Sequence, residues 1–272
     1  MAPIKTLDID RLDAADLSAA LGLSAEAGWN QTEADWRVFL DLGQVFACRD
    51  DAGKPVATAA ILPYGEFAWI SMVLVTASHR QQGLGTHLLK HCINTLQRMG
   101  CTPYLDATPA GEKVYLPLGF RPVFGITRWQ GQGSGKAGEA AAVDLEPCLS
   151  LDMHAFGAPR APLLKSFLGR VPELAMHKGE AFVVARSGRL ATQIGPLVAP
   201  DETAALGLLR AALDRAAGPV FLDVPDRWTS LNEDLKQRGF TIQRGFRRMA
   251  LNNGRPNGEP ARSFVIAGPE FG

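Results

Sequence analysis

Hydrophobic residues follow two kinds of spacing along the chain, and together they predict a mixed α/β protein. Short runs rich in Val, Ile and Phe alternate with segments whose apolar residues recur every three to four positions. The clearest helical segment is 83–99, in which leucines share one face and polar residues the other. The pattern predicts strands at 4–8, 45–49, 56–62, 68–75, 103–107 and 120–129, and helices at 13–21, 32–42, 83–99 and 111–118.

The second half of the chain repeats the end of the first half. The segment Gly100–Asp106 reappears as Gly218–Asp223, each time between two helical patterns. Further along, Phe120–Arg128 and Phe240–Arg248 share the spacing Phe-x4-Gly-x2-Arg. Two matched elements of this kind predict two copies of one fold. We expect a first domain at 1–130, a flexible Gly- and Ala-rich linker at 131–142, a second domain at 143–251 and a polar tail at 252–272.

Composition limits the possible partners. The 272 residues include 28 Lys plus Arg and 28 Asp plus Glu, so no net charge attracts nucleic acid or an anionic membrane. No secretory signal pattern and no apolar run of about 18 residues is present, which favours a cytoplasmic protein. The four cysteines form no CxxC pair, and His87 and His91 have no third ligand of the right type nearby. We therefore expect buried thiols and no metal.

The most specific feature runs from a buried strand through a glycine loop into a helix, over residues 73–86. Glycines allow close approach to the backbone, and the first free N–H groups of a helix point at one spot. The positive end of the helix dipole lies behind them. This arrangement predicts a pyrophosphate site.

Two motifs resemble those of the GNAT acetyltransferase superfamily. Arg80-Gln-Gln-Gly83-Leu-Gly85 fits its (Gln/Arg)-x-x-Gly-x-(Gly/Ala) motif, and Tyr115-Leu-Pro-Leu-Gly119-Phe120 is similar to its Tyr-x-x-x-Gly-Phe segment. The likeness covers most of 3–130, and the second half looks like a degenerate copy. The resemblance implies two tandem GNAT-like folds. Each has a central, mostly antiparallel sheet with a splayed parallel strand pair, flanked by helices.

The resemblance also implies acetyl-CoA as acyl donor. Its pantetheine arm would run along the strand edge at 72–75, which splays away from 103–107, and its pyrophosphate would lie in the loop. Thr108 falls where many relatives carry a CoA-binding asparagine, and its hydroxyl could substitute. The residues expected to bind the cofactor are Val73, Leu74, Val75, Arg80, Gln81, Gln82, Gly83, Leu84, Gly85, Thr86 and Thr108.

Catalytic roles follow from the same resemblance. Tyr115 matches the general acid that protonates the departing thiolate, and a phenol with a pKa near about 10 is protonated at neutral pH. A tyrosine that only packs in the core is the alternative. The glutamate that some relatives use as base falls on Trp69, so Glu66 and Asp106 are the substitutes. Glu66 could equally be a solvated turn residue, and Asp106, which recurs as Asp223, a structural one.

The acceptor site is the least defined. Trp29 and Asn30 lie in the helical region that lines it in GNAT proteins, although tryptophans near helix starts also serve as core anchors. In the second copy, 194–206 lacks the glycine loop, and Asp201 and Glu202 at the helix start would repel a pyrophosphate. We expect this copy to bind no CoA and to close the acceptor cleft.

These features predict an N-acetyltransferase that moves the acetyl group of acetyl-CoA to a primary amine of a small molecule. The reaction would proceed by direct attack in a ternary complex. A non-catalytic acyl-CoA sensor and a protein lysine acetyltransferase are the alternatives. The sequence specifies neither the acceptor nor the oligomeric state.

Overall fold

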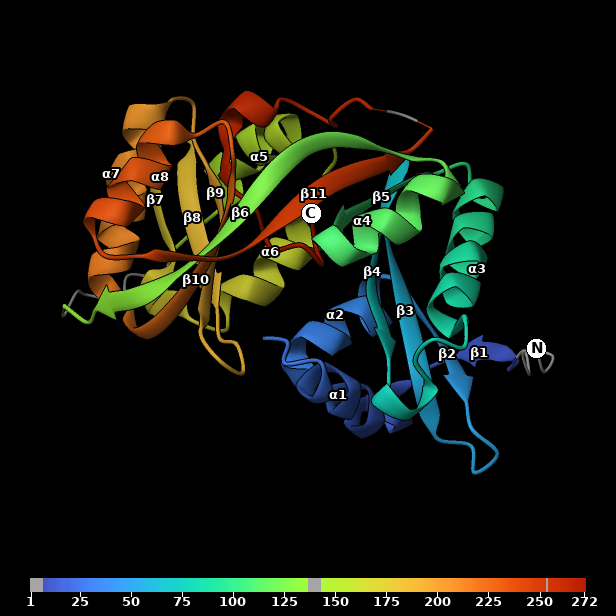
Figure 1. Ribbon diagram of the computed structural model, residues 1–272. Coiled ribbons are helices and arrows are strands. Elements are labelled where there is room, and N and C mark those ends of the chain that lie inside the picture. The colour runs from blue at the N-terminus through green and yellow to red at the C-terminus, as the bar shows by residue number, and fades with distance from the viewer. Residues whose placement is uncertain (1–6, 137–142, 253) are drawn as a thin grey trace. The chain divides into compact units, whose positions relative to one another are not determined.

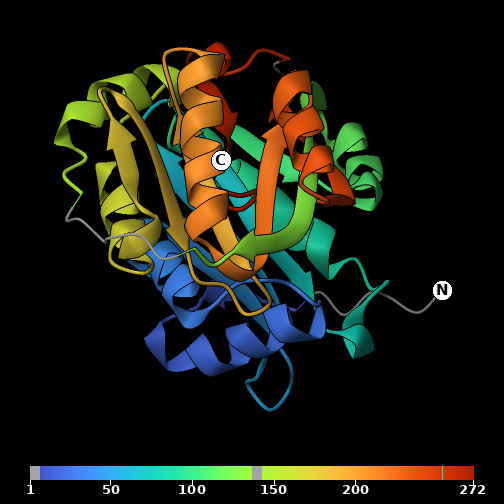
Figure 2. The ribbon, with the colours of Figure 1, turned by 90° about the vertical axis from the view of Figure 1, so that its left-hand side faces the viewer.

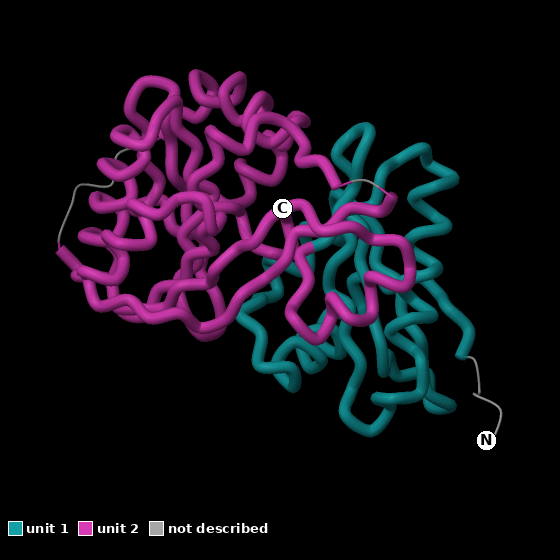
Figure 3. Tube along the Cα trace, turned by 45° about the horizontal axis from the view of Figure 1, so that its top comes forward, with its two compact units in different colours: residues 1–105 teal, residues 106–272 magenta. Residues whose placement is uncertain are grey.

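In a computed structural model, the chain forms two compact units, unit 1 (residues 1–105) and unit 2 (residues 106–272) (Figures 1 and 3). The structure describes residues 7–136, 143–252 and 254–272. Part of the strand expected at 4–8 and most of the expected linker lie outside these residues. The first described strand is β1 (Ile9–Arg11).

Unit 1 is built on an antiparallel meander that ends in a parallel strand. The strands follow in the order β1, β2 (Gln44–Arg49), β3 (Pro55–Tyr64), β4 (Phe67–Val75) and β5 (Thr102–Ala107). The helices of unit 1 are η1 (Ala14–Asp16), α1 (Leu17–Glu26), α2 (Glu33–Leu42), η2 (Ala77–His79) and α3 (Leu84–Arg98). The first strand, β1, begins after the strand expected at 4–8, and the short helix η2 was not predicted. The other elements agree with those predicted, apart from shifts of a few residues at their ends.

Local sequence explains where these helices begin and what they bury. Thr32 caps α2, and its backbone N–H donates to Asp35 Oδ2 at 2.8 Å, which satisfies a donor that the helix start leaves free. Trp36 of α2 is fully buried and donates from Nε1 to the hydroxyl of Ser24 on α1 at 3.0 Å. Helix α3 buries a single apolar face, Leu84, Leu88, Leu89, Cys92, Ile93 and Leu96.

Unit 2 contains a mixed sheet in the order β11-β6-β10-β9-β8-β7, with β12 on β9. Its strands are β6 (Phe120–Ser134), β7 (Met176–Lys178), β8 (Ala181–Arg186), β9 (Thr192–Val198), β10 (Ala217–Pro225), β11 (Thr241–Leu251) and β12 (Ser263–Val265). Its helices are α4 (Pro109–Tyr115), η3 (Leu116–Leu118), η4 (Glu146–Cys148), α5 (Leu149–Phe156), α6 (Ala161–Leu168), η5 (Pro172–Leu174), α7 (Glu202–Arg215), α8 (Thr229–Gln237) and η6 (Pro260–Arg262).

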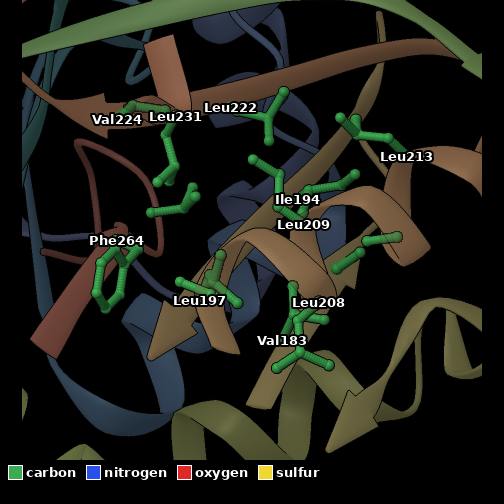
Figure 4. Packing of buried hydrophobic residues seen from close by; sticks show 14 of the residues in the cluster. Val183, Ile194, Leu197, Leu208, Leu209, Leu213, Leu222, Val224, Leu231 and Phe264 are labelled. Carbon is green, nitrogen blue, oxygen red and sulfur yellow. The ribbon is translucent and has the colours of Figure 1, made fainter. Parts of the chain in front are cut away.

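The main apolar core of unit 2 lies between one face of this sheet and the helices α7 and α8. Figure 2 looks onto the side of these two helices. Ile194 of β9, Leu209 of α7 and Leu222 of β10 are fully buried and lie together in Figure 4. Residues 220, 222 and 224 of β10 therefore face the helices, and alternation along the strand turns residues 221 and 223 to the opposite face.

The sequence repeat reappears in unit 2 as two reciprocal ion pairs. Arg128 on β6 donates to both carboxylate oxygens of Asp223 on β10, at 2.8 and 2.7 Å. Arg248 on β11 donates to both oxygens of Asp106, at 2.9 Å each. Each arginine thus pairs with the aspartate of the other copy. Strand β6, which ends the first copy, lies between β10 and β11 of the second copy.

Two predicted segments differ from the structure. Strand β6 continues to Ser134, so the first residues expected in the linker are paired with β10. The segment expected as a polar tail contains β12, and Phe264, Val265 and Phe271 within it are fully buried. Its apolar stretch, which begins at Phe264, is too short to stand out after the twelve polar, Gly, Pro and Ala residues 252–263. The domain boundaries themselves, drawn on the repeat, remain a prediction.

Candidate functional site

The parallel pair β4 and β5 separates along its length, as predicted for a splayed pair. Their pairing covers only Phe67–Trp69 opposite Thr102–Tyr104, although β4 continues to Val75 and β5 to Ala107. On its other side β4 stays paired with β3 as far as Val75. The second half of β4 therefore offers its remaining backbone edge to a ligand, which can add to it as an extended strand would.

A bulge interrupts β4 in the middle of this half. The sequence has no glycine at this position that would indicate the bulge. Met72 has φ +52°, and the register with β3 shifts between Thr58 and Ala60. The hydroxyl of Thr58 donates to the Met72 carbonyl at 2.9 Å, which helps to hold a backbone conformation that is costly for a non-glycine residue. The bulge turns the strand locally at the start of the edge expected to bind pantetheine, residues 72–75.

Backbone directions beyond the bulge agree with the predicted roles of Val73 and Val75. The Thr76 N–H donates to Val56 O on β3 at 2.9 Å. Because successive residues of a strand alternate, the backbone groups of Val73 and Val75 point to the open edge. There the Val75 carbonyl accepts a hydrogen bond from Arg80 Nε at 3.1 Å. Leu74 is 4% exposed, and by the same alternation its backbone groups point toward β3 and not to the open edge.

The loop after β4 presents a helix start to solvent. Gln81 and Gly83 adopt left-handed conformations, with φ +61° and +79°, and Gly83 caps α3. Arg80, Gln81 and Gln82 are exposed, whereas the Leu84 side chain is buried, so Leu84 can offer only its N–H. A Cβ on Gly85 would lie 3.6 Å from Val75 and 3.8 Å from Val73, which shows how closely the first turn packs on β4. With the N–H groups of Leu84, Gly85 and Thr86, this geometry suits an oxyanion.

Glu26 is a residue of this site that the sequence interpretation missed. Its carboxylate, at the end of α1, accepts hydrogen bonds from the Thr76 hydroxyl at 2.7 Å and from the Ala77 N–H. It also lies 3.7 Å from the Arg80 guanidinium. The hydrogen bond from Thr76, followed by that from Ala77, lowers the pKa of Glu26 below its ordinary value. Fifty residues separate it from the loop, so no local motif could reveal it.

Unit 2 holds Tyr115 and Thr108 at the two ends of α4. Thr108 caps this helix and accepts the Gly111 N–H at 3.2 Å, so its hydroxyl hydrogen remains free to donate. The half-buried Tyr115 ring lies against Gly111 and 6.0 Å from the Phe120 ring, centroid to centroid. Burial raises the pKa of Tyr115 to about 12, so the phenol keeps its proton at neutral pH.

The contacts of the two carboxylates proposed as bases favour their structural alternatives. Both oxygens of Asp106 accept from Arg248, and its side chain is fully buried. Glu66 is an exposed turn residue before β4, at the opposite end of that strand from the phosphate loop. Trp69, at the family's glutamate position, is 1% exposed and stacks on Tyr104. A base among these residues remains an untested prediction.

The predicted acceptor residues Trp29 and Asn30 follow α1 in unit 1. Gly28 has φ +69° and turns the chain after this helix, and the Trp29 N–H donates to Ser24 O at 2.9 Å. Trp29 is half-buried, and Asn30 is 7% exposed. Their contact with an acceptor stays a prediction.

In the second copy, the position that corresponds to the cofactor site of unit 1 is occupied by other residues of unit 2. Strands β9 and β10 pair in parallel only over Thr192–Ile194 and Val220–Leu222. Beyond that, β12 pairs with β9, and the Ile266 N–H donates to Asp223 O of β10 at 3.0 Å. Asp201 caps α7 and accepts the Ala204 N–H at 2.8 Å. Strand β12 therefore takes the edge that would bind pantetheine, and a carboxylate takes the helix start.

Two features are absent from the part of the chain that the structure describes. Among the residues that the structure describes, no three His, Cys, Asp or Glu side chains come together to hold a metal ion. In the same part of the chain, no helix combines the length and the apolar character needed to cross a membrane.

Comparison with known proteins agrees with the repeat. The model of the Acetyltransferase (GNAT) family matches residues 15–120, and that of an Acetyltransferase (GNAT) domain matches residues 148–264. YitH of Bacillus subtilis (strain 168), described as an uncharacterized N-acetyltransferase, is 23% identical over 86% of this chain and 87% of its own.

Solved structures share the fold. A candidate acetyltransferase from Pyrococcus horikoshii has a TM-score of 0.84 at 19% identity, covering 98% of this chain and 96% of its own. A tandem GNAT protein from the clavulanic acid biosynthesis pathway has a TM-score of 0.60 at 16% identity, covering 90% and 98%. Both family matches identify the chain as an acyltransferase. It belongs to the GNAT superfamily, as a tandem GNAT N-acetyltransferase.

Proposed function

We propose that the chain transfers the acetyl group of acetyl-CoA to a primary amine of a small acceptor, by direct attack in a ternary complex. The observation that carries this proposal is the open edge of β4 leading into a left-handed loop and the start of α3. The closed edge of the second copy supports a single cofactor site per chain. The cytoplasmic location expected from the sequence is part of the same proposal.

Acetyl-CoA supplies an activated acyl group as a thioester. In the proposed mechanism, the N–H groups of Leu84, Gly85 and Thr86 hold the pyrophosphate, and the backbones of Val73 and Val75 orient the pantetheine arm. Backbone N–H groups near the Met72 bulge polarise the carbonyl that the amine attacks.

Two protons leave the acceptor nitrogen, one before the attack and one from the adduct after it. One goes to solvent, and the other replaces the proton that Tyr115 gives to the departing sulfur. Tyr115, protonated at neutral pH, donates toward the sulfur as negative charge develops on it. The acceptor amine, with an ordinary pKa near about 10.4, must lose a proton before attack. Asp106 is occupied by Arg248 and Glu66 lies at the other end of β4, so we assign this step to water.

Calorimetric titration with acetyl-CoA tests the cofactor site. We expect binding of one equivalent, abolished in Gly83→Val because a β-branched residue is strained at φ +79° and the loop must rearrange. Gly53→Val is the matched control, since Gly53 in the β2–β3 turn has the same φ and equally open surroundings. Two equivalents would show that the second copy binds the cofactor, and no binding would refute the proposal.

Tyr115→Phe separates an enzyme from an acyl-CoA sensor. In an enzyme we expect turnover to fall about 100-fold, the lower end of the range for general acid catalysis, with acetyl-CoA affinity retained. Because the pKa of Tyr115 is about 12, its ionisation should produce no loss of wild-type activity between pH 7 and 10. Unchanged turnover in the variant would contradict the assigned role.

A further inference from the structure

Ser71 of β4 carries a buried hydroxyl that the fold leaves without a hydrogen-bond partner. The residue is 8% exposed, and its Oγ forms no hydrogen bond with any residue that the structure describes. The hydroxyl of Ser24 on α1, by contrast, is buried and accepts from Trp36 Nε1 at 3.0 Å. A buried polar group without a partner destabilises the fold, so it calls for an explanation. A ligand that supplies the missing partner would provide one.

Ser71 lies where the open edge of β4 begins. The pairing of β4 with β5 ends at Trp69 and Tyr104, and the bulge at Met72 follows directly after Ser71. In the proposed complex the pyrophosphate lies at the start of α3, and the pantetheine arm runs back along β4 from there. Because the sulfur is at the far end of this arm, the thioester comes to the beginning of the open edge, beside Ser71.

The Ser71 side chain points to the face of β4 opposite α3. In the register with β3, Ser71 lies across from Ala60, and Leu74 lies across from Thr58. Residues across from each other share a face, and the two β3 partners are two positions apart, so Ser71 and Leu74 share one face. Val75, next to Leu74, points to the other face, where it packs on the first turn of α3.

An acceptor can approach the thioester from the face on which Ser71 lies. Helix α3 covers the opposite face of β4, whereas α1 and α2 lie on the Ser71 side of the sheet (Figure 1). The predicted acceptor residues Trp29 and Asn30 follow α1 on this same side. Ser71 is also the only residue of β4 that carries a hydroxyl. It is therefore the hydroxyl of this strand that faces the predicted acceptor region.

We propose that the Ser71 hydroxyl binds the acceptor nitrogen. Its Oγ accepts a hydrogen bond from an N–H of the amine, which leaves the nitrogen lone pair free to attack the thioester carbon. This inference rests on the proposed acetyl transfer and adds a residue to its acceptor site. The carbon–nitrogen bond forms and the carbon–sulfur bond breaks as in that reaction, and Ser71 neither gains nor loses a proton.

The test compares two serine variants of unit 1. Turnover is followed by release of the CoA thiol with ethanolamine, glucosamine, spermidine and glycinamide, and KM is measured for the best of these acceptors. Ser71→Ala should raise this KM about fivefold, the effect of one ordinary hydrogen bond. Because the bond is present both before and during the attack, kcat should stay unchanged, as should the acetyl-CoA affinity measured by calorimetry. Ser24→Ala is the control, because it removes the same atom from a buried serine whose hydroxyl has a partner, and KM should stay at the wild-type value.

Urea denaturation separates this role from a structural one. Ser71→Ala removes a hydroxyl that the fold leaves unpaired, so its urea midpoint should equal or exceed that of the wild type. Ser24→Ala breaks the hydrogen bond from Trp36, so its midpoint should fall. A lower midpoint, an unchanged KM or weaker acetyl-CoA binding in Ser71→Ala overturns the inference. A wild type that acetylates none of the four amines would instead refute the proposed function, on which the role of Ser71 depends.

Discussion

The Glu26 carboxylate joins the end of α1 to the loop that precedes α3. It accepts from the Thr76 hydroxyl and the Ala77 N–H, the two residues at which the chain leaves β4. In Glu26→Gln one amide nitrogen replaces an acceptor, so one of these hydrogen bonds is lost. We expect the dissociation constant of acetyl-CoA, measured by calorimetry, to rise about fivefold, the equivalent of one ordinary hydrogen bond.

The control for this variant is Glu33→Gln on α2, an exposed carboxylate whose partner is Arg37 one turn away. It removes the same charge from unit 1 without touching the loop, and the affinity should stay at the wild-type value. Tighter binding of acetyl-CoA to Glu26→Gln would mean that repulsion between Glu26 and the pyrophosphate outweighs the stabilisation of the loop by the hydrogen bonds to Glu26. That result would contradict the positioning role.

At the residue scale, the sequence predicted those site residues whose positions depend on neighbouring residues in the chain. Gly83 and Gly85 could be placed at a helix start because the strand, loop and helix are contiguous. Glu26 and the Arg248 partner of Asp106 could not, since their contacts span 50 and 142 positions of sequence. The bulge at Met72 was also hidden, because a non-glycine residue occupies the left-handed conformation.

At the scale of elements, the two copies differ most in what lies beside their splayed strand. In unit 2 the C-terminal strand β12 pairs with β9 where unit 1 leaves β4 open. A Cβ on Gly195 of β9 would lie 2.2 Å from the Ile266 carbonyl oxygen, and Gly195 has φ +138°. The close approach of these backbones depends on this glycine.

Gly195→Ala should therefore lower the free energy of unfolding by about 2–4 kcal/mol, combining backbone strain with the clash. Urea denaturation measures this loss. Gly207→Ala, in the middle of α7 with nothing within 4 Å, is the control and should gain up to about 1 kcal/mol of stability. A Gly195→Ala protein as stable as the wild type would show that β12 is not held closely against β9.

The strand β12 also shows why composition misled the prediction for this segment. Its apolar run is only 264–267, of which Phe264 and Val265 lie in β12, and it follows a stretch rich in Gly, Pro and charged residues. A three-residue strand carries too little periodicity to be recognised. What fixes it is the unpaired edge of β9, a property of the folded unit that no window of sequence contains.

At the scale of the whole molecule, the two copies of the repeat pair their last strands with each other and exchange the partners of their ion pairs. Strand β6 pairs with β10 and β11, and each copy supplies the arginine that neutralises the buried aspartate of the other. The matched spacing of Phe, Gly and Arg in the two copies predicted the duplication correctly. It could not predict the exchange, because a repeat gives the same pattern whether each arginine pairs within its own copy or across.

Double variants distinguish the observed pairing from pairing within each copy. Arg128→Met alone leaves the fully buried Asp223 without its cation and should cost about 3–5 kcal/mol of stability. Asp223→Leu added to it removes the uncompensated charge, so the matched double variant should regain most of the loss. Asp106→Leu added to Arg128→Met instead leaves Asp223 without Arg128 and Arg248 without Asp106, so the two losses should add. Recovery in this second combination, measured by urea denaturation, would mean that Arg128 pairs with Asp106 and that the exchange between the copies is wrong.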